Sequence, residues 1–169
     1  MFSDDIKPWL FSIEPKVGES FSHFLGRVRR ANHLTPSSLG KLVNIGLVVA
    51  RWERFHLNPF PTSNELKALA DVIGISAERL REMLPPQGVS MKCEPIRLCG
   101  ACYGDSPCHR IEWQYQKVWK CDKHNLLLLS KCPKCEARFQ IPALWEDGCC
   151  HRYRCRLPFG DMAKYQNPA

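Results

Sequence analysis

Residues 99–135 read CGACYGDSPCHRIEWQYQKVWKCDKHNLLLLSKCPKC, and this stretch decides how the chain folds. It contains three pairs of metal-ligating residues, each separated by two positions, and a fourth, wider pair follows it. A tight turn with such a pair points both ligands at one ion, and a second pair from a distant element completes a tetrahedron. Paired in order, the segments predict two structural zinc ions, one held by three cysteines and a histidine and the other by four cysteines. The predicted ligands are Cys99, Cys102, Cys121, His124, Cys132, Cys135, Cys150 and Cys155.

The last pair has three candidates for its first ligand, because Cys149, Cys150 and His151 are adjacent and any of them could act with Cys155. We choose Cys150, since Cys149 would have to reverse direction to reach the same ion. Three further residues are surplus to the two sites. We expect them to be buried small hydrophobic side chains, at Cys93 and Cys108, and a surface imidazole at His109.

Disulfide bonds are a weaker explanation of the ten cysteines, all of which lie between Cys93 and Cys155. Disulfides form in oxidising compartments, and the first residues lack the basic and then apolar plan of a signal peptide. No run reaches the roughly 18 apolar residues that a membrane span needs. We therefore expect a soluble chain in the cytoplasm, associated with the bacterial nucleoid and with no membrane partner.

The chain of 169 residues has room for one ordinary domain or two small ones, and its composition is globular. We predict a small modular α+β fold: an N-terminal arm over residues 1–18, a helical helix-turn-helix domain over 19–90, and zinc-ribbon-like zinc fingers over 91–130 and 131–169. The arm carries apolar anchors, Trp9 among them, which pack on the chain itself or on a partner.

The helix-turn-helix prediction rests on two short amphipathic segments. Thr62 and Glu65 form a capping box, Gly74 supplies a left-handed stop, and a second helix follows. In a DNA-reading version, Arg79 and Arg81 at the start of that helix would face the bases. The half from 1 to 90 carries 11 basic and 9 acidic residues, so a packing unit or protein-docking surface fits equally well.

The zinc half is more basic, with 13 basic and 8 acidic residues over 91–169. Alternating apolar residues predict a strand at 111–115, and the leucine run at 126–129 predicts a buried strand shared by both metal sites. Basic and aromatic residues near the ligands are candidates for nucleic-acid or partner contact, with a solvated surface as the alternative. Those candidates are Lys120, Arg152 and Arg154, together with Trp9, Arg79 and Arg81.

No catalytic residues are predicted. Zinc deaminases need His-x-Glu followed by Pro-Cys-x-x-Cys, and here Glu112 lies three positions after His109. A metal-dependent nuclease would need an open metal position, whereas both predicted sites use four protein ligands. The sequence also contains no glycine-rich phosphate-binding motif and no Gly-x-Ser-x-Gly nucleophile elbow.

The order of these motifs resembles the TniQ/TnsD family of transposition proteins. Gly18-Glu19-Ser20-Phe21 opens the first helix, and the succession Cys121-x-x-His124, leucine run, Cys132-Pro-Lys-Cys135 is the most specific part. The resemblance extends over roughly residues 8–160 and is nearest to the short TniQ of CRISPR-associated transposons with a type V effector. The final pair departs from it, because relatives tend to have a closer Cys-x-x-Cys there.

The resemblance implies a non-catalytic adaptor. Such proteins bind the AAA+ ATPase TnsC, which then recruits the transposase. In RNA-guided systems they lie between TnsC and the CRISPR effector with its guide RNA and target DNA. The alternative is a helix-turn-helix and zinc-ribbon transcription regulator, which would bind duplex DNA sequence-specifically with a steep salt dependence. The free chain is expected to be monomeric.

Overall fold

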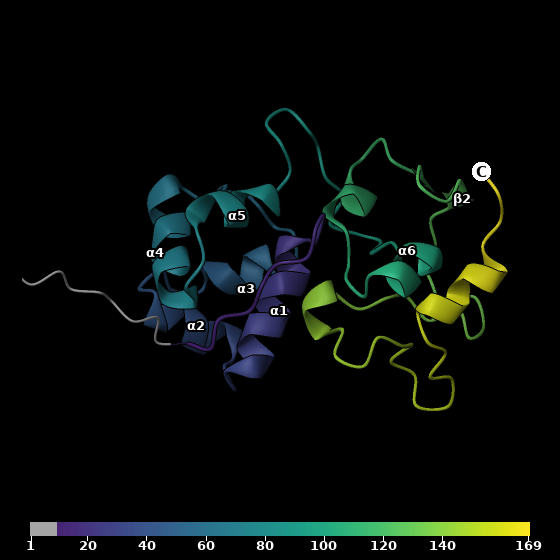
Figure 1. The fold of residues 1–169 in the computed structure, drawn as a ribbon, viewed down its shortest axis with the longest axis horizontal. Helices are drawn as coiled ribbons and strands as arrows, with labels where there is room; N and C mark the ends of the chain where they lie inside the picture. Colours follow the sequence, from purple (N-terminus) through teal and green to yellow (C-terminus); the bar gives the residue numbers. More distant parts are fainter. Residues whose placement is uncertain (1–9) are drawn as a thin grey trace, which may run out of the picture.

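A computed structural model describes residues 10–169. Figure 1 shows a helical N-terminal half beside a C-terminal half of short helical turns, one small hairpin and long connections. The helices of the N-terminal half are α1 Phe21–Ala31, α2 Pro36–Leu42, α3 Val48–Trp52, α4 Ser63–Ile73 and α5 Ala77–Glu82. The C-terminal half contains α6 Gly100–Asp105, the 3-10 helices η1 Ile111–Gln114, η2 Pro142–Leu144 and η3 Gly160–Tyr165, and the strands β1 Lys120–Cys121 and β2 Leu126–Leu127.

Local sequence signals fix the ends of the N-terminal helices. The Thr62 hydroxyl accepts a hydrogen bond from the Glu65 amide, and the Glu65 carboxylate accepts one from the Thr62 amide, which completes the predicted capping box. Gly74 ends α4 in the left-handed region at a φ of 84°. The Ser76 side chain then caps α5. Two helices joined by a short turn are therefore present, and their use as a DNA-reading unit stays a prediction.

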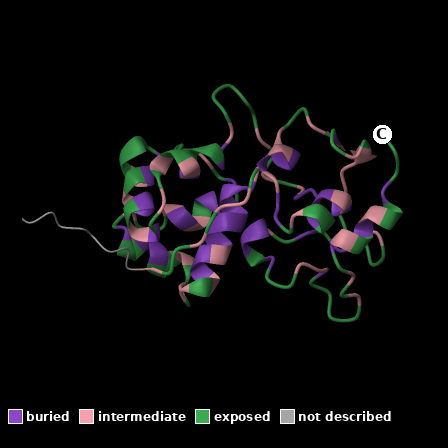
Figure 2. Cartoon of the chain, viewed as in Figure 1, coloured by how far each residue is buried: buried purple, intermediate pink, exposed green. Residues whose placement is uncertain are grey.

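The N-terminal helices enclose one apolar core. Phe24, Leu25 and Val28 of α1 are fully buried, and they belong to the same core as Leu69 and Ile73 of α4. Figure 2 shows the buried faces of these helices turned toward one another. Leu10 and Ile13 of the arm pack on this core, in agreement with an arm that packs on its own chain.

The C-terminal half has a second core, built around its cysteines. Six of the eight predicted ligands belong to it or pack against it, together with Trp113, Trp145 and Phe159. The only ladder of paired strands among residues 10–169 is the antiparallel hairpin of β1 and β2, with Cys121 opposite Leu126. With so little regular hydrogen bonding, this half depends on its aromatic packing and on the cysteine clusters.

The strand predicted at 111–115 is wrong, because this segment forms the 3-10 helix η1. A strand would bury alternate residues, yet Trp113 and Gln114 are both fully buried. The Gln114 side chain accepts a hydrogen bond from the Arg97 amide and donates to the carbonyl oxygens of Lys92 and Pro95. Burying an amide with its partners satisfied costs little, so a turn that buries both residues is stable.

The leucine run is strand in part only. Leu126 and Leu127 form β2, and Leu129 makes an isolated bridge with Leu98. All four leucines are half-buried, so the predicted buried strand is wrong in its burial. The run lies at the edge of the C-terminal core, where one side remains open to solvent.

The two halves are joined by hydrogen bonds around α1 to main-chain carbonyl oxygens. The carbonyl oxygen of His109 accepts from the Ser20 amide at 2.7 Å, and Arg30 donates to the carbonyl oxygens of Ala143 and Trp145. Gly26 permits the closest approach, because a Cβ there would lie 2.3 Å from the Ala143 carbonyl oxygen. Helix α1 therefore packs on both cores.

One residue of this junction differs from its predicted place. His109, expected at the surface, is completely buried, with its Nδ1 2.8 Å from the Ser20 hydroxyl and its ring between Phe55, Trp113 and Trp145. Helix α3 ends at Trp52, and Phe55, at a φ of 61°, contributes its side chain to the C-terminal core.

Candidate metal centres

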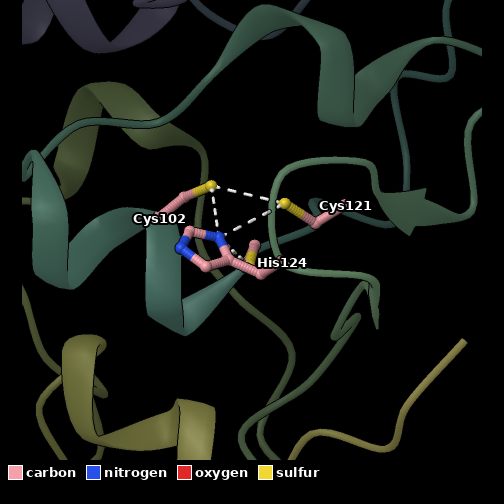
Figure 3. Close-up of side chains that lie close together, drawn as sticks. Cys102, Cys121 and His124 are labelled. Carbon is pink, nitrogen blue, oxygen red and sulfur yellow. Dashed lines mark hydrogen bonds between the residues drawn. The ribbon is translucent and has the colours of Figure 1, made fainter.

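The first cluster combines the start of α6 with the turn of the hairpin. Cys99 caps α6 and Cys102 lies within its first turn, while Cys121 ends β1 and His124 follows in the turn. Figure 3 shows the side chains of Cys102, Cys121 and His124 turned toward one another. The Nδ1 atom of His124 lies 3.2 Å from the sulfur of Cys102, 3.6 Å from that of Cys121 and 3.9 Å from that of Cys99. The ligand atoms of all four residues lie within 4.8 Å of one another.

The second cluster lies between two long connections of the C-terminal half. The sulfur atoms of Cys132 and Cys155 are 3.6 Å apart, and those of Cys135 and Cys150 are 3.5 Å apart. All four again fall within 4.8 Å of one another. Cys132 and Cys150 are buried, Cys155 is half-buried and Cys135 is exposed, so this cluster is the more open of the two.

Both donor sets fit a tetrahedral zinc ion. A Zn–S bond of about 2.3 Å places two sulfur atoms of a tetrahedron about 3.8 Å apart. The closest sulfur pairs, at 3.4 to 3.6 Å, and the sulfur–nitrogen distances in the first cluster match this spacing. Thiolates with imidazole or thiolates alone are the ligands of structural zinc. Two metal-binding clusters compatible with zinc are therefore present, and each supplies four protein ligands.

Because the thiols of each cluster lie close together, their pKa values shift in opposite directions. The hydrogen bond with Cys102 lowers the pKa of Cys99 to about 5, whereas the same contact and burial raise the pKa of Cys102. In the second cluster, hydrogen bonding from the Ala137 amide lowers the pKa of Cys135 to about 7. A thiol that ionises readily in each cluster suits metal capture, because the thiolate is the form that binds a metal.

Of the three adjacent candidates for the second cluster, Cys150 is the one that belongs to it. Cys149 and His151 lie outside both four-residue clusters, although they flank a member of the second. Cys108 is buried, as expected for a small hydrophobic side chain. Cys93 is half-buried, and its thiol contacts the carbonyl oxygen of Phe55 at 3.3 Å.

The predicted contact residues of the helical half have partners of their own. Arg79 forms an ion pair with Glu82 at 3.4 Å and donates to the carbonyl oxygen of Pro15, and Arg81 faces Glu78 at 4.0 Å. These pairs leave little free positive charge on α5. Trp9 lies outside the described residues.

Free positive charge gathers instead at the second cluster. Lys134, Arg152 and Arg154 line a hollow beside Cys135 and Cys155, and within residues 10–169 none of the three has a carboxylate partner. We call Lys134, Arg152 and Arg154 the basic rim. Among residues 10–169 Lys120 has no carboxylate partner either, and its Nζ lies 5.9 Å from the ring centre of the exposed Trp119.

Sequence reasoning missed two features. One is an open groove of about 1060 Å³ between α5, the 85–91 connection and the end of α3, with a largely apolar lining that includes Phe60, Leu84 and Val89. The other is Asp105, whose Oδ2 lies 3.1 Å from Nε2 of His124. Cys99, Cys102 and Asp105 recur at three-residue intervals, and this helical spacing is the signal that could have found the carboxylate.

Comparison with known proteins gives the family. The model of the family TniQ matches residues 10–128, more than two thirds of the chain. The chain belongs to the TniQ family. It is thus a transposition-associated protein, as the order of its motifs indicated. A search of curated proteins finds no match.

The TniQ match has a clear extent along the structure. It begins at the arm, includes all of α1 to α6 and the first cluster, and ends in the leucine run. The second cluster and the basic rim lie beyond it. Within the part of the chain that the structure describes, no helix has both the length and the apolar character required to cross a bilayer.

Proposed function

We propose that this TniQ protein is a non-catalytic targeting adaptor of a transposon, which binds the AAA+ ATPase TnsC and links RNA-guided target-site selection to transposase recruitment. The observation that carries the proposal is the family match over residues 10–128. The CRISPR effector with its guide RNA and target DNA would be the partner on the other side, and the transposase would be reached through TnsC.

The metal clusters support a structural rather than a catalytic role for zinc. Each cluster offers four protein ligands within 4.8 Å of one another. An ion with four protein ligands keeps no position for water or substrate, and such sites stabilise the fold. The family, whose members are in general non-catalytic, agrees with this role.

Nucleic-acid contact is assigned to the basic rim. Arg152 and Arg154 are exposed and lack carboxylate partners within residues 10–169, and the 92% exposed Tyr153 lies between them. Guanidinium groups bind phosphate oxygens bidentately, and an exposed aromatic ring can stack on an unpaired base. The alternative is a transcription regulator that reads DNA sequence through Arg79 and Arg81. It has less support, because both arginines are paired with acidic residues.

Co-sedimentation tests the adaptor. The protein would be mixed with TnsC from the same transposon, ATP and duplex DNA, with and without the effector bound to its guide RNA, and the filaments would be pelleted. We expect it in the pellet in a defined ratio to TnsC, and in the supernatant when TnsC is omitted. Its absence from the pellet both with and without the effector would overturn the proposal. Sequence-specific retention of genomic DNA fragments without TnsC would favour the regulator.

A further inference from the structure

The side chain of Asp105 faces the first metal cluster from the end of α6. Its Oδ2 atom lies 3.1 Å from Nε2 of His124 and 2.6 Å from Nζ of Lys123. The opposite nitrogen of the same imidazole, Nδ1, faces the sulfur atoms of Cys99, Cys102 and Cys121. One ring therefore connects the ligand set to the carboxylate.

The tautomer of His124 determines which ring nitrogen can bind a metal and which can donate a hydrogen bond. A neutral histidine has one nitrogen with a lone pair and one with a proton. With Nδ1 turned toward the thiols, binding a metal there places the proton on Nε2, where it points at Asp105. A carboxylate that accepts this proton orients the ring and makes the metal-binding nitrogen a stronger donor.

The helix itself gives no reason for an acid at this position. Asp105 is the last residue of α6, and the C-terminal end of a helix carries a partial negative charge. A carboxylate there is unfavourable unless cations or donors compensate it. His124 and Lys123 supply that compensation from the hairpin turn.

We propose that Asp105 is a positioning residue of the first metal site, which holds the His124 ring and slows loss of the ion. Cys99, Cys102 and Asp105 lie on one face of α6, so this helix supplies two ligands and the support of a third. The proposal rests on the ligand geometry and is independent of the role in transposition. The ion pair with Lys123 is secondary, because the side chains of Lys123 and Asp105 are 63% and 50% exposed and solvent screens them.

The test measures metal release from the full chain. Zinc transfer to a chromophoric chelator would be followed for Asp105→Ala, Asp105→Asn and Asp105→Glu. Cobalt substitution would assign each phase, because three-sulfur, one-nitrogen and four-sulfur sites have different visible spectra. We expect Asp105→Ala to release the first ion about 10- to 100-fold faster, with the second ion unaffected. Asp105→Glu should restore most of the retention.

Two matched variants separate the explanations. Lys123→Ala removes the ion pair and leaves the acceptor of His124 in place, and Asp161→Ala removes an exposed carboxylate paired with Lys164 on η3. Both should release metal at the wild-type rate. If Asp105→Ala behaves like Asp161→Ala, or if Lys123→Ala reproduces the Asp105→Ala effect, the assignment of Asp105 to His124 is overturned.

A spectroscopic readout tests the hydrogen bond itself. In the zinc-loaded wild type, long-range nitrogen–proton NMR should show His124 protonated at Nε2, with this proton exchanging slowly with water. Asp105→Ala should leave the tautomer unchanged and accelerate that exchange. An unchanged exchange rate would contradict the proposal even if metal release were altered.

Discussion

Gly26 of α1 lies directly against the backbone of Ala143 in η2, so closely that a Cβ on Gly26 would come within 2.3 Å of the Ala143 carbonyl oxygen and 2.6 Å of its Cα. The contact joins residues 117 positions apart and makes α1 part of both halves of the molecule. Hydrogen bonds from Arg30 to the carbonyl oxygens of Ala143 and Trp145 extend the same junction.

Replacing Gly26 by alanine should therefore destabilise the protein. The obstacle is backbone, which cannot rotate away, so α1 and η2 must move apart. We expect a loss of about 2 to 3 kcal/mol in the free energy of unfolding, measured by urea denaturation with zinc present. Gly104→Ala is the matched control, because its Cβ would meet nothing nearer than 3.9 Å and alanine favours the helix. Equal stability of the two variants would contradict the close contact.

His109 should make stability depend on pH. Burial lowers the pKa of His109 well below its usual value of 6.5, so this side chain is neutral in the folded protein and protonated in the unfolded chain below that pH. The unfolded state then binds more protons, and stability falls with acidification. Between pH 8 and pH 6 the contribution of one such histidine is roughly 0.8 kcal/mol.

The variant His109→Phe should lose that part of the pH dependence. The variant also differs in absolute stability, because the hydrogen bond to Ser20 is removed. The quantity to compare is therefore the slope of the unfolding free energy against pH in the variant and in the wild type. Unfolding would be followed from pH 8 to 6 with excess zinc to keep the metal sites loaded. Identical slopes for the variant and the wild type would show that His109 binds protons equally in the folded and unfolded states, which would contradict a lowered pKa in the fold.

The ligands of the second cluster should be distinguishable by metal content. Cys150→Ser removes a member of the cluster, and we expect the variant to bind one zinc ion and the wild type to bind two. Cys149→Ser and His151→Ala are matched controls on either side, and both should bind two. Native mass spectrometry counts the ions directly. Loss of one ion in Cys149→Ser with retention in Cys150→Ser would reverse the assignment.

The basic rim should govern nucleic-acid binding. Replacing Arg152 and Arg154 by alanine should weaken binding to single-stranded RNA or duplex DNA and reduce the slope of log K against log salt by about 2, one for each phosphate contact. The double variant Arg79→Ala/Arg81→Ala removes the same charge from α5, where acidic partners already offset it. This variant should retain the wild-type slope of log K against log salt. If the slope fell in this variant alone, the nucleic-acid-binding surface would be on α5 instead of the basic rim.

Sequence reasoning was strongest where the chemistry is local. The capping box at Thr62, the stop at Gly74 and the Cys-x-x-Cys spacing each depend on residues a few positions apart, and all three are present as predicted. The family resemblance, which used the order of such local motifs, is confirmed over residues 10–128. The boundaries of the four predicted units, by contrast, stay a prediction.

The failures came from contacts between distant residues. The segment 111–115 alternates like a strand, but the hydrogen bonds of Gln114 to residues 92–97 bury a polar side chain that the pattern places outside. His109 is buried because three aromatic rings from separate segments surround it. Asp105 was missed because its partner, His124, comes from another element. No local pattern names these partners; the spacing of Cys99, Cys102 and Asp105 places the carboxylate near the site but does not identify His124 as its partner.

The position of Phe55 has a consequence for cooperativity. This residue follows α3 in the helical half, yet its ring is buried in the core that also contains Cys99, Cys121 and Cys132. Release of metal loosens that core and so withdraws the support of Phe55 and of the chain that leads back to α3. Amide hydrogen exchange in α1 and α3 should therefore report on zinc bound in the other half, and the two halves should unfold as one thermodynamic unit.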